Sequence, residues 1–325
     1  DKAAWSELSV NESQPARNGL KDFALIVGGL AVVRMVLPFI PVPKVIAPVA
    51  DFLLLVGIFL ATVYAIYRAM SSKPTPVQAG LMLLAGVAIQ AAFIGVAILN
   101  NKVGIWAIIS QGLAQTGLMV WCIGLGALIA SLLREKNIVI PVALFLIAFD
   151  IFLVLTPQGF TQKMMKANPQ VFTNMAMAIP KVATETQQAS SSAVLEAAYV
   201  GPADLVFLGT FFLAMFRFNM EPKETLKLMV PVLVVYMLFV TLTGIALPAL
   251  VPIGLVTLLV NRKEFKLSKD ELASTLVLTV LLISGLIYLA TKKKAPPVEP
   301  SPSANAQEFQ IPAGSPAPVM ANQPQ

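Results

Sequence analysis

The amino-acid sequence predicts an all-α fold, a polytopic transmembrane helical bundle of about nine spans. Hydrophobic residues make up 57% of the 325 residues and charged residues only 12%, with a mean hydropathy of +0.79. This balance is far more apolar than that of a soluble domain. The apolar residues also fall into runs close to the roughly 20 residues that cross the hydrocarbon core as a helix. These runs lie at 23–40, 46–67, 77–99, 103–133, 137–156, 200–219, 227–246, 247–260 and 272–291.

Two of these runs leave the span count open. The run 103–133 fits either one tilted helix or a re-entrant piece followed by a span, and the run 247–260 is short. With nine spans, Lys and Arg residues gather on the side of the N-terminus, which predicts a cytoplasmic N-terminus by the positive-inside rule. Dividing 103–133 into two spans would remove that bias.

Composition along the chain predicts five regions. Residues 1–22 form a polar N-terminal tail, 23–136 the N-terminal transmembrane helices, 137–260 a transmembrane core, and 261–291 an extra C-terminal helix. Residues 292–325 are rich in Pro, Ala and Ser, a composition that predicts a disordered tail. The loop 157–199 inside the core contains Met and Phe residues such as Met164, Phe172 and Met177, which indicate a segment lying at the membrane interface.

Residue usage excludes several chemistries. The chain has no histidine, which removes most zinc, haem and Ser-His-Asp sites, and its one cysteine, Cys122, is expected to be a small buried hydrophobe. We therefore predict no metal and no cofactor, and chemistry that runs on carboxylates, hydroxyls or amines. The net charge of +6 lies mostly in short loops beside the spans, so the lipid bilayer is a partner and nucleic acid is not.

Several polar residues within the spans have a structural interpretation. Arg34 and Asp51 flank a short turn, so they would meet as an ion pair between the first two spans. Gln111 and Gln115 share a helix face and would hydrogen-bond a neighbouring helix. The stretch GLGALIAS, residues 124–131, predicts a small-residue face for close helix packing.

Asp150 and Asp204 point to a functional site. A charged group at the centre of a span costs roughly 2.5–3.5 kcal/mol unless it is paired or functional. Asp150 precedes the 157–199 loop and Asp204 follows it, so two antiparallel helices would bring both carboxylates to the same depth. For Asp204 an alternative remains open, because Gly201 and Pro202 form a good helix start and an acidic residue there would act as a cap.

A third element maps to the same side of the membrane. Pro248 and Pro252 interrupt the last apolar runs and leave backbone groups without helical partners. Irregular backbone at membrane depth is tolerated only where it is buried in protein or faces a cavity. The segment Pro248-Ala249-Leu250 is therefore expected beside the two aspartates.

Phe149-Asp150, the Gly-x-x-Asp at 201–204 and Pro-Ala-Leu at 248–250, in this order, resemble the presenilin and signal peptide peptidase family of intramembrane aspartyl proteases. The resemblance covers roughly residues 137–260. It implies Asp150 and Asp204 as catalytic residues, and Pro248, Ala249, Leu250 and Gly201 as substrate-binding ones. Two positions depart from the family pattern. Phe149 stands in place of a tyrosine, and Ala203 in place of a glycine where helices are expected to approach closely.

The resemblance implies hydrolysis of peptide bonds in transmembrane segments by a two-aspartate general acid/base mechanism. Transmembrane peptides would be the substrates. Two alternatives stay open. The chain would be an inactive homologue that serves as a structural subunit of a membrane complex, with the Pro-rich tail docking other subunits. Or it would be an ion-coupled transporter or channel, for which intramembrane aspartates and broken helices are equally expected.

Overall fold

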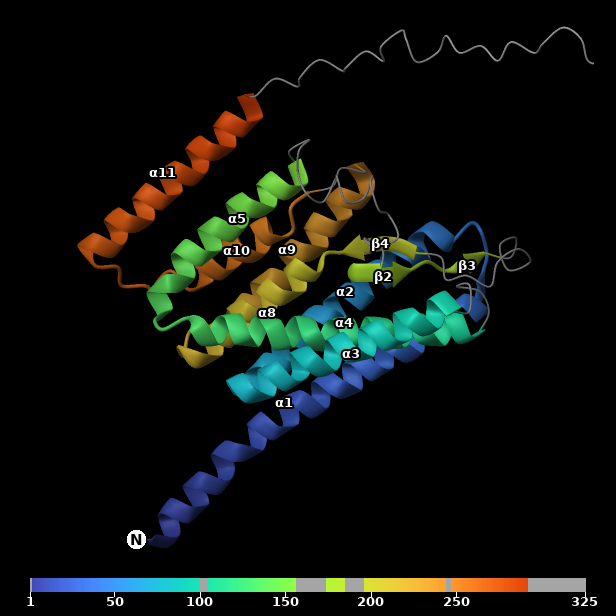
Figure 1. Ribbon diagram of the computed structural model, residues 1–325, viewed down its shortest axis with the longest axis horizontal. Helices are drawn as coiled ribbons and strands as arrows, with labels where there is room; N and C mark the ends of the chain where they lie inside the picture. The colour runs from blue at the N-terminus through green and yellow to red at the C-terminus, as the bar shows by residue number, and fades with distance from the viewer. Residues whose placement is uncertain (1, 100–104, 156–173, 185–195, 244–246, 292–325) are drawn as a thin grey trace, which may run out of the picture.

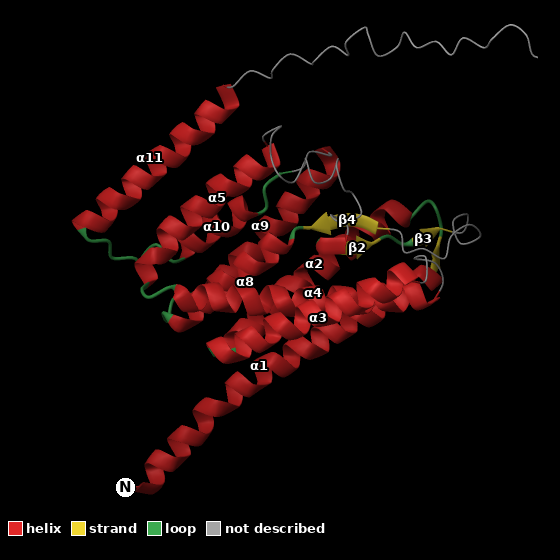
Figure 2. Cartoon of the chain, in the orientation of Figure 1, coloured by secondary structure: helices red, strands yellow, loops and turns green. Residues whose placement is uncertain are grey.

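The computed structural model describes residues 2–99, 105–155, 174–184, 196–243 and 247–291 (Figure 1). Within these ranges nine α-helices dominate the chain, which confirms the all-α fold class (Figure 2). Six helical segments are long and apolar enough to cross a membrane, as expected of a membrane protein. The helices are α1 (Lys2–Val36), α2 (Ala47–Ser71), α3 (Pro76–Leu99), α4 (Ile105–Leu132), α5 (Val139–Leu155), α8 (Pro202–Arg217), α9 (Pro222–Thr243), α10 (Leu250–Val260) and α11 (Lys269–Thr291).

The structure shows what the two apolar runs that left the span count open become. The run 103–133 contains one continuous helix, α4, of 28 residues, so the division into two pieces is wrong. The run 247–260 becomes α10, an apolar helix of only 11 residues. The described part of the polar segment, residues 2–22, is the beginning of α1, a helix whose apolar part forms the candidate span Asn18–Phe39. The tail at 292–325 lies outside the described residues.

The described parts of the loop 157–199 form short strands, which the sequence analysis did not predict. Strand β2 (Met177–Pro180) pairs antiparallel with β4 (Glu196–Val200), and β1 (Pro41–Val42) pairs with β3 (Ala183–Thr184) in parallel. Met177 is buried instead of lying at an interface, while Met164 and Phe172 fall outside the described residues. Since β4 ends at Val200, it leads directly into α8 at Pro202.

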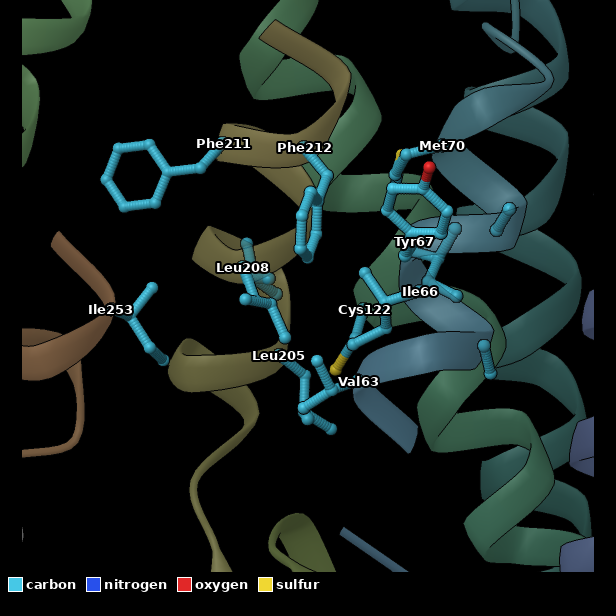
Figure 3. Packing of buried hydrophobic residues seen from close by; sticks show 14 of the residues in the cluster. Val63, Ile66, Tyr67, Met70, Cys122, Leu205, Leu208, Phe211, Phe212 and Ile253 are labelled. Atoms are coloured by element: carbon cyan, nitrogen blue, oxygen red, sulfur yellow. The ribbon is translucent and has the colours of Figure 1, made fainter. Parts of the chain in front are cut away.

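A large part of the buried core lies where α2, α4 and α8 meet (Figure 3). Phe212 of α8 packs edge-on against Tyr67 of α2, with ring centroids 5.4 Å apart. Cys122 of α4 is fully buried among Val63 and Leu205, as the sequence predicted. This close packing fixes the position of α8. The helix begins at Pro202, and Asp204 is its third residue.

Small residues bring α4 close to two neighbours, which confirms the packing face predicted at 124–131. A Cβ built on Gly124 would lie 2.7 Å from the carbonyl oxygen of Ala79 in α3, and one on Gly126 would collide with the carbonyl oxygen of Val206 in α8. The hydroxyl of Thr210 in α8 also donates to the carbonyl of Gly126 (3.1 Å). Backbones packed this closely gain dispersion energy and interhelical hydrogen bonds, which hold helices together in lipid.

Helices α1 and α2 run antiparallel and are joined by an ion pair between Asp22 and Arg68. Arg68 uses both Nε and Nη2 to contact one carboxylate oxygen of Asp22. The two first spans are therefore tied at the end opposite to the turn where the sequence analysis expected an ion pair.

Candidate functional site

Asp150 and Asp204 line one cavity of about 600 Å³ among the helices. Its walls come from α2, α5, α9, the strand β4 and the start of α8. The turn before α10 contributes Leu247 and Ala249. A cavity of this volume, lined mainly by apolar side chains with a few polar groups, has room for several water molecules as well as part of a ligand.

Asp150 enters the cavity from α5 and is 7% exposed. Its Oδ2 accepts a hydrogen bond from the backbone N–H of Leu250 (2.8 Å). Leu250 is the first residue of α10, so this N–H is one of the groups that a helix leaves without an intrahelical partner. The carboxylate thus connects α5 to the Pro-Ala-Leu turn.

Asp204 lies in the first turn of α8, which begins at Pro202 with Gly201 as its N-cap. The backbone N–H of Asp204 donates to the carbonyl of Gly201 (3.2 Å), and a Cβ on Gly201 would lie 3.2 Å from Oδ2 of Asp204. This is the capping geometry in which an acid at the third helical position reaches back to the N-cap. The capping alternative is therefore correct in its geometry, yet the same carboxylate also faces the cavity.

Asp150 and Asp204 face the same cavity, one from α5 and the other from the start of α8. Ion pairs among the described residues join Arg68 to Asp22, Lys136 to Glu264 and Lys227 to Glu224, and none includes Asp150 or Asp204. Two carboxylates in one low-dielectric site repel each other when both are ionised.

The Pro248-Ala249-Leu250 segment lies beside the aspartates, as expected from the sequence. Pro248 is buried, Ala249 lines the cavity, and Leu250 binds Asp150 through its backbone. The hydroxyl of Tyr236 in α9 donates to the carbonyl of Leu247, the residue before the turn. Gly201, the fourth residue implied to bind substrate, lies next to Asp204 at the start of α8.

Arg34 and Asp51 are found in two different cavities. Oδ1 of Asp51 accepts the backbone N–H of Val182 (2.8 Å), and Asp51 lines the aspartate cavity. Arg34 is buried beside Gln111 and Gln115 around a small separate cavity. The predicted pair is not among the ion pairs that join described residues at 4.0 Å or less.

Gln115 binds a strand instead of the neighbouring helix that the sequence analysis expected. Its Nε2 donates to the carbonyl of Ala176 (3.3 Å), and its Oε1 accepts the N–H of Ala178 (3.2 Å). The amide therefore satisfies backbone groups at the edge of β2, where a two-stranded sheet leaves them without partners.

The two departures from the family pattern lie away from the cavity. Phe149 is 42% exposed, stacks on Phe145, and lines an apolar groove between α5 and α11. Ala203 is exposed, so its methyl group does not occupy a close contact between helices, contrary to the expectation from the sequence. The close approaches of α8 are at Gly209, against Met70, and opposite Gly126.

Sequence reasoning missed four polar residues of the cavity, Tyr236, Thr241, Tyr199 and Lys181. Tyr236 gave a usable signal, since it places a phenol within the apolar run 227–246. Tyr199 and Lys181 gave none, because their positions depend on the pairing of β2 with β4 across a long loop.

Within the described ranges, no group of three or more His, Cys, Asp or Glu side chains has the geometry to hold a metal ion. Comparison with known proteins yields no matching family model, curated protein or solved structure. The chemistry of the site must therefore be argued from the cavity itself.

Proposed function

We propose that the chain is a presenilin-like intramembrane aspartyl protease that hydrolyses peptide bonds of transmembrane segments. The observation that carries the proposal is the meeting of three distant elements at one cavity. Asp150 and Asp204 both line it, and Asp150 is hydrogen-bonded to the Pro-Ala-Leu turn. A packing role alone gives no reason for two acids beside an open volume inside a membrane protein.

The proposed reaction needs only the two carboxylates and a water molecule. The ionised carboxylate takes a proton from water, whose oxygen forms a bond to the scissile carbonyl carbon while the protonated carboxyl gives its proton to the carbonyl oxygen. The C–N bond then breaks as the amide nitrogen receives a proton from the first carboxyl. The second carboxylate recovers its proton from the tetrahedral intermediate's hydroxyl group, and the pair again holds one proton.

Burial contributes to this chemistry by excluding bulk solvent. Asp150 is almost fully covered, and apolar side chains such as Phe52, Leu55 and Phe59 form one wall of the cavity. In such surroundings the charge that develops on the scissile carbonyl interacts more strongly with a proton donor than it would in water. The backbone around Ala249 offers polar groups to an unwound substrate segment.

The first test is peptide cleavage by the full chain, purified in detergent or nanodiscs. A synthetic transmembrane peptide is incubated with the wild type, with Asp150→Asn and with Asp204→Asn, and the products are identified by mass spectrometry. We expect each substitution to reduce cleavage by at least about 1,000-fold, since it removes one partner of the acid/base pair. An aspartyl-protease transition-state inhibitor should suppress the wild-type activity.

Asp270→Asn is the matched control, because this exposed aspartate lies at the start of α11 and outside the cavity. It should cleave at the wild-type rate. If the folded wild type cleaves no peptide, or if both cavity variants remain active, the protease proposal fails. Absence of cleavage by an intact fold would favour an inactive homologue with a structural role.

A further inference from the structure

Tyr236 occupies a position that the two-aspartate mechanism does not use. It is half-buried in α9 and lines the same cavity as Asp204 and Asp150. Its hydroxyl group donates to the carbonyl oxygen of Leu247 and not to a carboxylate. The phenol is therefore close to the acids but bound to the backbone beside them.

The segment 247–250 is consequently held at both ends. Tyr236 binds the carbonyl of Leu247, and Asp150 binds the N–H of Leu250. Between these two hydrogen bonds lie Pro248, which has no N–H, and Ala249, which lines the cavity. A short turn fixed at two points has little freedom to rotate its backbone groups, so a change at one end is transmitted to the other.

We propose that Tyr236 is a positioning residue of the site, whose hydroxyl holds the turn so that the N–H of Leu250 stays on Oδ2 of Asp150. Only the kinetic test of this role rests on the proposed protease function; the hydrogen-exchange test does not. Because Asp150 lies on α5 and Tyr236 on α9, the turn connects two helices that both pack against α10.

Removal of the hydroxyl gives a direct structural readout. In Tyr236→Phe the Leu247 carbonyl loses its donor, the turn gains freedom, and the Leu250 amide separates more often from Asp150. Hydrogen exchange of peptides that contain Leu250, measured by mass spectrometry on the full chain, should be accelerated about fivefold to tenfold. Tyr64→Phe is the matched control, since Tyr64 is an exposed residue of α2 outside the cavity.

A double substitution tests the link to Asp150. In Asp150→Ala the Leu250 amide has already lost its acceptor, so adding Tyr236→Phe should change its exchange by less than about twofold. Independent, additive effects of the two substitutions would show that Tyr236 does not act through this hydrogen bond, and would overturn the proposal.

Kinetics separate positioning from general destabilisation. The concentration of active sites is first determined by titration with a tight-binding inhibitor. Tyr236→Phe should then lower kcat about tenfold and change KM by less than twofold, because Asp150, which loses its alignment, takes part in the chemical step. An unchanged kcat, or unchanged exchange at Leu250, overturns the proposal. If the wild type cleaves no peptide, the protease function fails on its own, while the exchange experiment still supports or overturns the role of the hydroxyl.

Discussion

The two aspartates lie on parts of the molecule that are held together in different ways. Asp204 begins α8, which is packed against α4 and α2 through glycines, buried aromatic rings and an interhelical hydrogen bond. Asp150 lies on α5, which packs mainly against the short α10 and against α11 (Figure 1). One carboxylate therefore belongs to a dense scaffold, and the other to a less enclosed group of helices.

This difference indicates how the spacing of the acids is controlled. The position of Asp204 is fixed by backbone contacts that tolerate little movement. The position of Asp150 depends on individual hydrogen bonds, above all the one from Leu250, and on side-chain contacts such as Ile147 against Gly254. A substrate could enter with less rearrangement on the α5 side, because fewer close contacts would need to separate there.

Among substitutions outside the cavity, the largest effect is expected in the scaffold. Gly126→Ala places a methyl group against the carbonyl of Val206, so α4 and α8 must move apart. Overpacking of this kind costs about 1–3 kcal/mol. We expect a clearly lower midpoint of thermal unfolding in detergent, together with reduced cleavage, because Val206 is only half a turn from Asp204.

Gly80→Ala on α3 is the matched control, since a Cβ at this position meets no atom within 4 Å. Removing a flexible residue from a helix there should leave stability unchanged or raise it by up to about 1 kcal/mol. Equal midpoints for the two variants would contradict the tight packing of α4 against α8.

The sequence carried the information for the scaffold but only part of that for the site. Apolar runs and the small residues at 124–131 are local patterns, so helix α4 and its close packing could be predicted. The prediction that antiparallel spans bring Asp150 and Asp204 near each other agrees with the cavity that both of them line. The strands could not be predicted, because β2 and β4 are joined across a long loop and each has few residues.

The partners of polar and charged side chains were also only partly predictable from the sequence. Asp51 was expected to bind Arg34, yet its carboxylate accepts a backbone N–H from Val182, a residue that only the strand arrangement brings nearby. A polar side chain binds one of the many donors that the tertiary structure brings near it, and few of these donors can be identified from the sequence. The same reasoning explains why Gln115 binds β2.

A smaller effect is expected at the attachment of α11, the outermost helix on the α5 side. Ser268 and Glu271 form a reciprocal capping box, and Asn137 at the start of α5 also donates to Glu271. Hydrogen bonds from the Ser268 backbone, then from Asn137 and the Ser268 hydroxyl, lower the pKa of Glu271. A lowered folded-state pKa stabilises the attachment above the ordinary pKa of a glutamate, and this stabilisation is lost as the pH falls through the lowered value.

Glu271→Gln imitates the protonated state. At pH 7 we expect hydrogen exchange in the first turn of α11 to be about twofold to threefold faster in this variant than in the wild type. The difference between the two proteins should disappear as the pH falls below the lowered pKa of Glu271, where the wild-type carboxylate becomes protonated. Asp270→Asn controls for the charge at the helix N-terminus. A difference that persisted unchanged at low pH would contradict a role for the ionised group.

The smallest effect is expected at Phe149, although it neighbours Asp150 in the chain. Adjacent residues of a helix point about 100° apart, and the Phe149 ring stacks on Phe145 in the groove toward α11 while Asp150 faces the cavity. A hydroxyl added by Phe149→Tyr would therefore enter this groove and reach neither carboxylate. We expect kcat to change by less than about twofold, measured with the same peptide. An increase of tenfold would mean that α5 rotates during catalysis, so that the less enclosed helices, and not the scaffold, determine which face of α5 meets the substrate.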